Sequence, residues 1–89
     1  MTRQVFAVQD VAAGIYLPPF VAHTEALAMR LFGDLCREPG HDFNRHPGDY
    51  TLFRIGTYDD ATGVMTSEAA VSFGNGMQHV QPQLEAVNA

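Results

Sequence analysis

The strongest structural signal lies in residues 46–64, HPGDYTLFRIGTYDDATGV. A proline and a glycine mark a loop, and from Tyr50 the residues become aromatic and β-branched, as a strand requires. Alternate side chains of a strand point to opposite faces, so we expect Phe53 and Ile55 to lie on the core side. The run DDATG has the composition of a hairpin loop, with its glycine in the left-handed conformation. The stretch therefore predicts a strand, a tight loop and a return strand.

The residues before this stretch indicate further strands. Residues 5–10 are apolar on both faces, which suits a central strand. After a turn, we expect residues 15–17 to pair back locally until Pro18 and Pro19 remove two backbone donors. Residues 20–22 continue in an extended conformation and lead into a helix.

A helix is predicted from about residue 24 to residue 37. Thr24 suits the N-cap position, and Pro39 follows the expected end. Placing residues at 100° intervals gives a broad apolar arc that we expect to cover the sheet, opposite a charged face. The arc comprises Ala28, Leu31, Phe32 and Leu35, flanked by Met29 and Cys36, and the charged face comprises Arg30, Asp34 and Arg37. Gly33 interrupts the helix at a cost of about 1 kcal/mol relative to alanine, either for close approach of another backbone or as a tolerated defect.

The rest of the chain gives weaker signals. Residues 38–49 form a polar loop whose only large apolar residue is Phe43. Beyond Met65 we expect a short strand at 69–73, a break at 74–76, a short helix from 77 to 80 and a loose tail from 84 to 89. The length indicates one domain over residues 1–89, with an ordered core at about 4–66 and weaker structure in 67–89.

The composition is that of a globular domain with an acidic balance. Ten carboxylates stand against five arginines and no lysine, which gives a formal net charge of −5. The apolar runs are too short for a membrane helix, and no signal peptide is evident at the N-terminus. Cys36 is the only cysteine, so an internal disulfide is impossible. We therefore expect a reducing cytoplasm and no membrane association.

Few side chains suggest chemistry. His41, Asp42 and His46 include two histidines five residues apart, but zinc sites usually show a second ligand pair, and a solvated loop is the favoured interpretation. Cys36 lies on the apolar side of the helix, where packing is a better explanation than nucleophilic catalysis. The adjacent aspartates of the DDATG run suit a turn better than an acid–base pair or a magnesium site. We assign no catalytic residue, no metal site and no cofactor.

Several motifs occur in a characteristic order along roughly residues 4–65. They are an N-terminal strand ending in Asp10, the pair Pro19-Phe20, AMRLFGD at 28–34, the pair His46-Pro47 and DYTLFRIGTYDDATG at 49–63. In this combination the chain resembles the small nonstructural protein of gokushovirus-like microviruses, tailless phages with single-stranded DNA genomes. The residues after Met65 match poorly.

The resemblance implies a non-capsid, nonenzymatic phage protein of the host bacterial cytoplasm that binds DNA and acts in single-strand genome synthesis and packaging. Such binders contact phosphates with cations and stack bases on aromatic rings. We therefore assign contacts with single-stranded DNA to Arg3, Arg45 and Arg54, with Tyr50 or Tyr58 stacking. The acidic charge leaves an alternative open: a homo-oligomeric module that contacts phage or host replication or packaging proteins without binding DNA.

These observations predict an α+β fold. We expect a small antiparallel sheet of three or four strands, with one main helix at about 24–37 packed on one face. The exposed strand edges favour a homodimer or a higher homo-oligomer.

Overall fold

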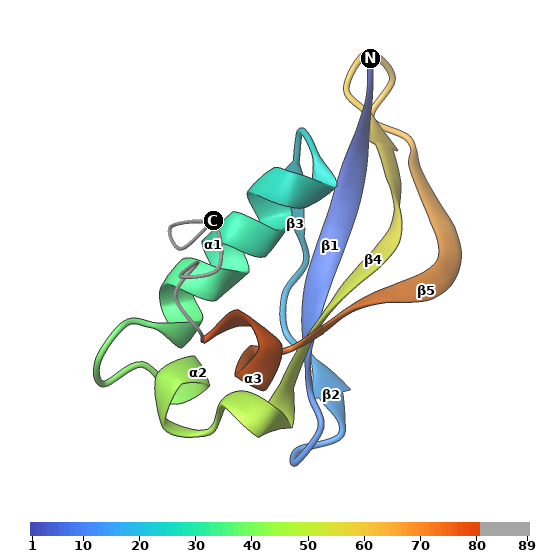
Figure 1. The fold of residues 1–89 in the computed structure, drawn as a ribbon. Coiled ribbons are helices and arrows are strands. Elements are labelled where there is room, and N and C mark those ends of the chain that lie inside the picture. Colours follow the sequence, from blue (N-terminus) through green and yellow to red (C-terminus); the bar gives the residue numbers. More distant parts are fainter. Residues whose placement is uncertain (81–89) are drawn as a thin grey trace.

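Two long antiparallel strands form the centre of the sheet. The computed structural model describes residues 1–80, in which β1 (Thr2–Asp10) pairs along its full length with β4 (Tyr50–Asp59). The pairing runs from Thr2 opposite Asp59 to Asp10 opposite Tyr50. β5 (Met65–Asn75) follows the other edge of β4, while β2 (Ile15–Tyr16) and β3 (Phe20–Ala22) pair in succession with the free edge of β1 (Figure 1).

The α+β class with one main helix is confirmed, but the sheet has five strands where three or four were expected. The reason is that residues 20–22 pair with β1 as a strand of their own, separated from β2 by Pro18 and Pro19. β5 also differs from expectation, because the return strand and the short strand expected at 69–73 form one continuous strand of 11 residues. Its first eight residues are exposed, so their sequence lacks the alternation that marks a half-buried strand.

Helix α1 (Glu25–Cys36) begins and ends as predicted. The Thr24 Oγ1 accepts a hydrogen bond from the Leu27 amide at 3.0 Å, and Arg37 is the C-cap. The buried face is narrower than expected, because Leu31 and Leu35 are exposed. The buried positions are Ala28, Phe32, Gly33 and Cys36.

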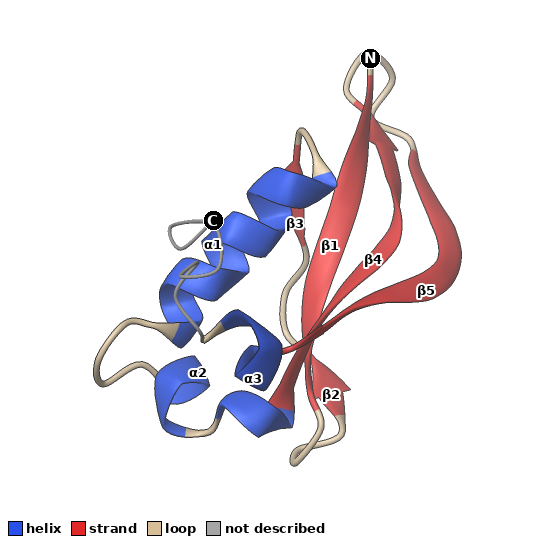
Figure 2. Cartoon of the chain, viewed as in Figure 1, coloured by secondary structure: helices blue, strands red, loops and turns tan. Residues whose placement is uncertain are grey.

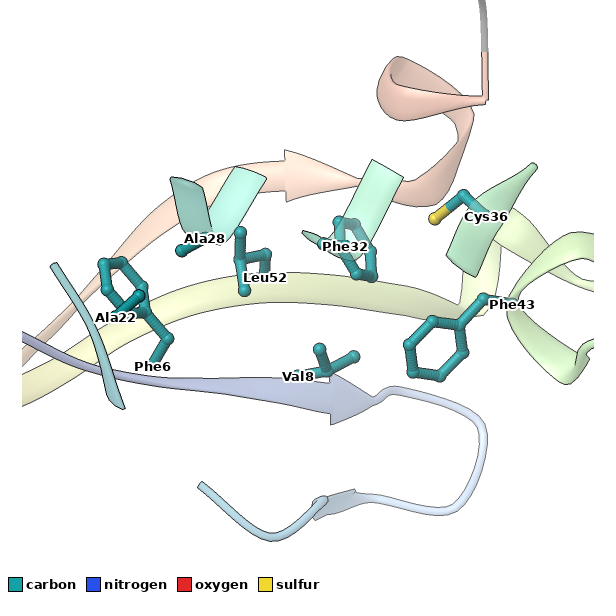
Figure 3. Close-up of a cluster of buried hydrophobic side chains, with 8 residues drawn as sticks. All are labelled: Phe6, Val8, Ala22, Ala28, Phe32, Cys36, Phe43 and Leu52. Carbon is teal, nitrogen blue, oxygen red and sulfur yellow. The ribbon is translucent and has the colours of Figure 1, made fainter. Parts of the chain in front are cut away.

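The core lies between α1 and one face of the sheet, with the helices on that same face (Figure 2). Figure 3 shows its eight buried side chains pointing toward one another from both layers. They are Phe6, Val8, Ala22, Ala28, Phe32, Cys36, Phe43 and Leu52. Phe43, the only large apolar residue of the polar segment, is buried in this core. The segment forms the short helices α2 (Asp42–Arg45) and η1 (Pro47–Asp49) instead of an open loop.

The face of β4 that meets the core was predicted wrongly. Leu52 is buried beside Val8, whereas Phe53 lies on the opposite face and packs against Tyr16 with ring centroids 5.8 Å apart. Alternation of side chains defines the two faces of a strand but does not say which face a helix covers. The prediction placed Phe53 and Ile55 in the core because they are the more apolar pair. Ile55 is the extra residue of a β-bulge, since Arg54 and Gly56 pair with consecutive residues of β1.

The chain after β5 turns back onto the core through a short helix. α3 (Gly76–His79) begins one residue before its expected start and carries a capping box between Asn75 and Gln78. Phe73 and Val80 pack against the core cluster, so packed structure extends beyond residue 66. The predicted loose tail lies outside the described residues.

Substitution of Gly56 by alanine is expected to destabilise the sheet. A Cβ at this position would lie 2.2 Å from the carbonyl oxygen of Thr66, a backbone atom that can move only if β5 shifts. We expect Gly56→Ala to lower the free energy of unfolding by about 2 kcal/mol or more, as measured by urea denaturation. Gly48→Ala is the control, because a Cβ there meets nothing closer than Met77 Cγ at 3.8 Å. Equal stability of the two variants would contradict this account.

Candidate nucleic-acid interface

Arg3 lies at the end of the sheet where β1 meets the β4–β5 hairpin. Tyr58 is its cross-strand neighbour on β4. The Arg3 Nε donates to the Asp60 carboxylate at 2.9 Å, and one terminal nitrogen lies 2.6 Å from Nδ1 of His23. Asp60 also accepts a hydrogen bond from the Met1 ammonium at 2.9 Å, and this bond, followed by the one from Arg3, lowers the pKa of Asp60. The charge of Arg3 is therefore compensated within the chain.

Arg54 lies on the opposite face of the sheet, beneath the start of α1. It pairs with Phe6 of the core, and it donates to the Glu25 carboxylate at 3.0 Å. Its Nε is buried, lacks a hydrogen-bond partner within the described chain and lies 4.0 Å from the Glu68 carboxylate. Two carboxylates thus surround the Arg54 guanidinium.

Arg45 and Tyr50 lie at the other end of the sheet. The Arg45 guanidinium forms an ion pair with the Asp42 carboxylate one turn away in α2. The Tyr50 ring packs against Phe43 with centroids 4.5 Å apart. Burial, followed by the charges of neighbouring aspartates, raises the pKa of Tyr50. Much of the Tyr50 ring is therefore engaged in packing.

The five residues assigned to DNA do not form one surface. Tyr50 and Tyr58 are eight residues apart on β4, which corresponds to about 26 Å along a strand. The strand register places Arg3 and Tyr58 on the face away from α1, whereas Arg54 and Tyr50 share the face toward it. The structure divides the predicted site into three places, each with its own carboxylate.

Arg30 and Arg37, on the charged face of the helix, line a groove between α1 and α3. The groove has a volume of about 520 Å³, and Arg30, Arg37, Gln78 and His79 contribute its polar atoms together with Asp34. Arg37 donates to the Asp34 carboxylate and to the His79 carbonyl, both at 2.8 Å. Among residues 1–80, Arg30 makes no ion pair with a carboxylate.

The groove gives a structural reason for a glycine at position 33. A Cβ at Gly33 would lie 3.0 Å from a terminal nitrogen of Arg37, so the glycine leaves room for the guanidinium to fold back across the helix toward α3. The close neighbour is a side chain of the same helix, not another backbone. Sequence reasoning missed the groove because α3 gives almost no periodic signal over its four residues.

The side chains considered for chemistry have structural partners. Burial raises the pKa of the Cys36 thiol to about 11, which disfavours the reactive thiolate. His41 Nδ1 accepts a hydrogen bond from the Phe43 amide at 3.0 Å. Asp59 Oδ1 accepts from the Ala61 amide at 2.9 Å, which confirms the turn interpretation.

Within the described residues, no three histidine, cysteine or acidic side chains converge as metal ligands. In the same part of the chain, every helix is too short or too polar to cross a bilayer.

The fold and these contacts define a small two-layer α+β domain whose arginines are largely paired with its own carboxylates. The sequence model of the Phage ORF5 protein family matches residues 3–78, and the chain belongs to this family. The resemblance to a phage protein is thereby confirmed. Searches of curated proteins and of solved structures gave no match.

The stability of the protein is expected to fall between about pH 9 and pH 11 because of Cys36. The thiol releases its proton near pH 9 in an unfolded chain and near pH 11 in the core, so rising pH favours the unfolded state within this window. We expect this group to contribute a loss of about 2 kcal/mol. The measurement is the free energy of unfolding by urea at pH 8 and pH 10.5. Cys36→Ala is the control and should show a shallower decline, while identical declines would contradict the assignment.

Proposed function

We propose that this protein is a nonenzymatic phage accessory factor of the host cytoplasm that acts as a homo-oligomeric module contacting phage or host replication or packaging proteins. Membership of the Phage ORF5 family supports the phage origin. The resemblance to the nonstructural protein of gokushovirus-like microviruses supports a role in single-stranded genome synthesis and packaging.

The pairing of three arginines with carboxylates of the same chain is the observation that favours protein contact over DNA contact. Arg3, Arg45 and Arg54 pair with Asp60, Asp42 and Glu25, respectively. A phosphate group would have to displace these carboxylates while approaching a chain with a net charge of −5. Nonspecific DNA affinity comes mainly from cations that replace counterions on phosphates, and cations already paired contribute little of it.

Direct contact with single-stranded DNA is the second candidate, and the end of the sheet near Arg3 favours it. A guanidinium, the His23 ring and the Tyr58 ring lie together there on the face of the sheet away from α1. Aromatic stacking is worth about 1–3 kcal/mol per base and tolerates any sequence. This arrangement would bind a short single strand by stacking more than by charge.

A titration of a labelled single-stranded oligonucleotide with the protein, followed by fluorescence anisotropy, distinguishes the two candidate functions. We expect no saturable binding by the wild-type protein at low salt. The triple variant Glu25→Gln, Asp42→Asn, Asp60→Asn changes the net charge from −5 to −2 and removes the nearest carboxylate partner of three arginines, so it should bind with a steep salt dependence.

The matched control is Asp10→Asn, Glu38→Gln, Asp49→Asn, which also changes the net charge from −5 to −2 but breaks no ion pair with an arginine. It should not gain comparable affinity. Saturable binding by the wild type, lost in the double variant Arg3→Ala, Tyr58→Ala, would instead establish the DNA candidate.

Affinity capture of the tagged protein from infected cells tests the protein-contact candidate. A phage or host replication or packaging protein should remain bound after nuclease treatment, because the contact does not pass through nucleic acid. Loss of every such protein on nuclease treatment would refute this candidate.

A further inference from the structure

The outer side of α1 carries a ridge of leucines that the core does not use. Leu27, Leu31 and Leu35 follow one another at intervals of one turn, with 36%, 44% and 38% of their surfaces exposed. Beside the ridge lies a groove of about 410 Å³ with an almost entirely apolar lining. Its residues are Val8, Phe20, Leu31, Phe32, Asp34, Leu35 and Phe43. This ridge and groove form an apolar surface that the described chain leaves uncovered.

Charged and capping residues flank the ridge on both sides of Leu31 along the chain. Arg30 and Asp34 are exposed on one flank, less than one turn to either side of it. Thr24, the N-cap, precedes Leu31 by seven residues, and the exposed Glu38 follows it by seven. Glu38 stands next to the C-terminus of its own helix, where the helix dipole disfavours a negative charge.

We propose that a second copy of this chain docks on this surface, with the two α1 helices antiparallel and the twofold axis at Leu31. This arrangement places Leu27 of each copy against Leu35 of the other. With a rise of about 1.5 Å per residue, Arg30 comes within about 3 Å along the axis of the second copy's Asp34. The Arg30–Asp34 ion pair forms twice by symmetry, as an isologous interface requires.

The same axis sets Glu38 of each copy beside Thr24 of the other. In the dimer, the Glu38 carboxylate also lies beside the N-terminus of the second copy's helix, where the helix dipole favours a negative charge. A second copy is the occupant that this charge pattern fits, because on an identical surface Arg30 meets an acidic side chain and Glu38 meets a helix N-terminus. Asp34, which already pairs with Arg37 of its own helix, would accept a second cation from the other copy. The dimer deepens the proposed function by supplying its homo-oligomer, and it does not depend on any phage or host partner.

Sedimentation velocity of the full chain tests the docking surface. The wild type should be a dimer, and Leu31→Asp should raise the dissociation constant at least a hundredfold, since the aspartates would meet on the axis. Met65→Asp is the control, because Met65 is an apolar residue on β5 whose side chain is more exposed than that of Leu31. A monomeric wild type, or a dimer weakened by Met65→Asp and not by Leu31→Asp, would overturn the proposal. Circular dichroism confirms that each variant is folded.

A charge exchange tests the orientation. Arg30→Asp sets two aspartates against each other across the axis and should weaken the dimer about tenfold. Arg30→Asp combined with Asp34→Arg restores opposite charges and should return most of the affinity. Failure of the double variant to recover, with its fold intact, would overturn the antiparallel arrangement.

The outcome for the dimer is separable from that for the proposed function. If a monomeric Leu31→Asp variant still captured a replication or packaging protein, the protein-contact function would stand and only its homo-oligomeric part would be refuted. A stable dimer that captures no replication or packaging protein would support the docking surface and refute the function.

Discussion

The pairing of β1 with β4 is the contact on which the other elements depend. These strands are about forty residues or more apart along the chain, and they close the loop that contains β2, β3 and α1. The bulge at Ile55 turns the register so that Arg54 faces α1 while Gly56 admits the backbone of β5. A chain that mispaired these strands by one residue would expose Phe6 and Val8 and lose the floor on which the helix packs.

Local signals in the sequence were sufficient for the elements with strong chemistry of their own. The N-cap threonine and the following apolar positions located α1 to within a residue, and the DDATG turn located the hairpin, with Gly63 at a φ of +78°. The burial of Leu52 in place of Phe53 was not predictable from alternation, because it depends on which face a helix far away in the sequence covers. The same dependence leaves Leu31 at the surface although its spacing suits the core.

The candidate site was predicted less well than the fold. Residue type selected Arg3, Arg45 and Arg54 as cations, but the ion pairs that compensate them join residues up to 57 positions apart in the sequence. The composition gives the net charge of −5 but does not show where the charged side chains lie in the folded protein. Arg30 and Arg37 come together with α3 only in the folded chain, so no spacing in the sequence marks their groove.

The Arg37 side chain adds a polar contact to the packing of α1 against α3. Its guanidinium reaches from the end of α1 to the carbonyl of His79, 42 positions later, while the His79 ring packs against Phe32 and bonds to the Phe73 carbonyl at 2.8 Å. Detaching α3 therefore breaks the Arg37 contact at the end of α1 as well as the packing on Phe32. We therefore expect the last described helix and the end of the main helix to open together, since each stabilises the other against local unfolding.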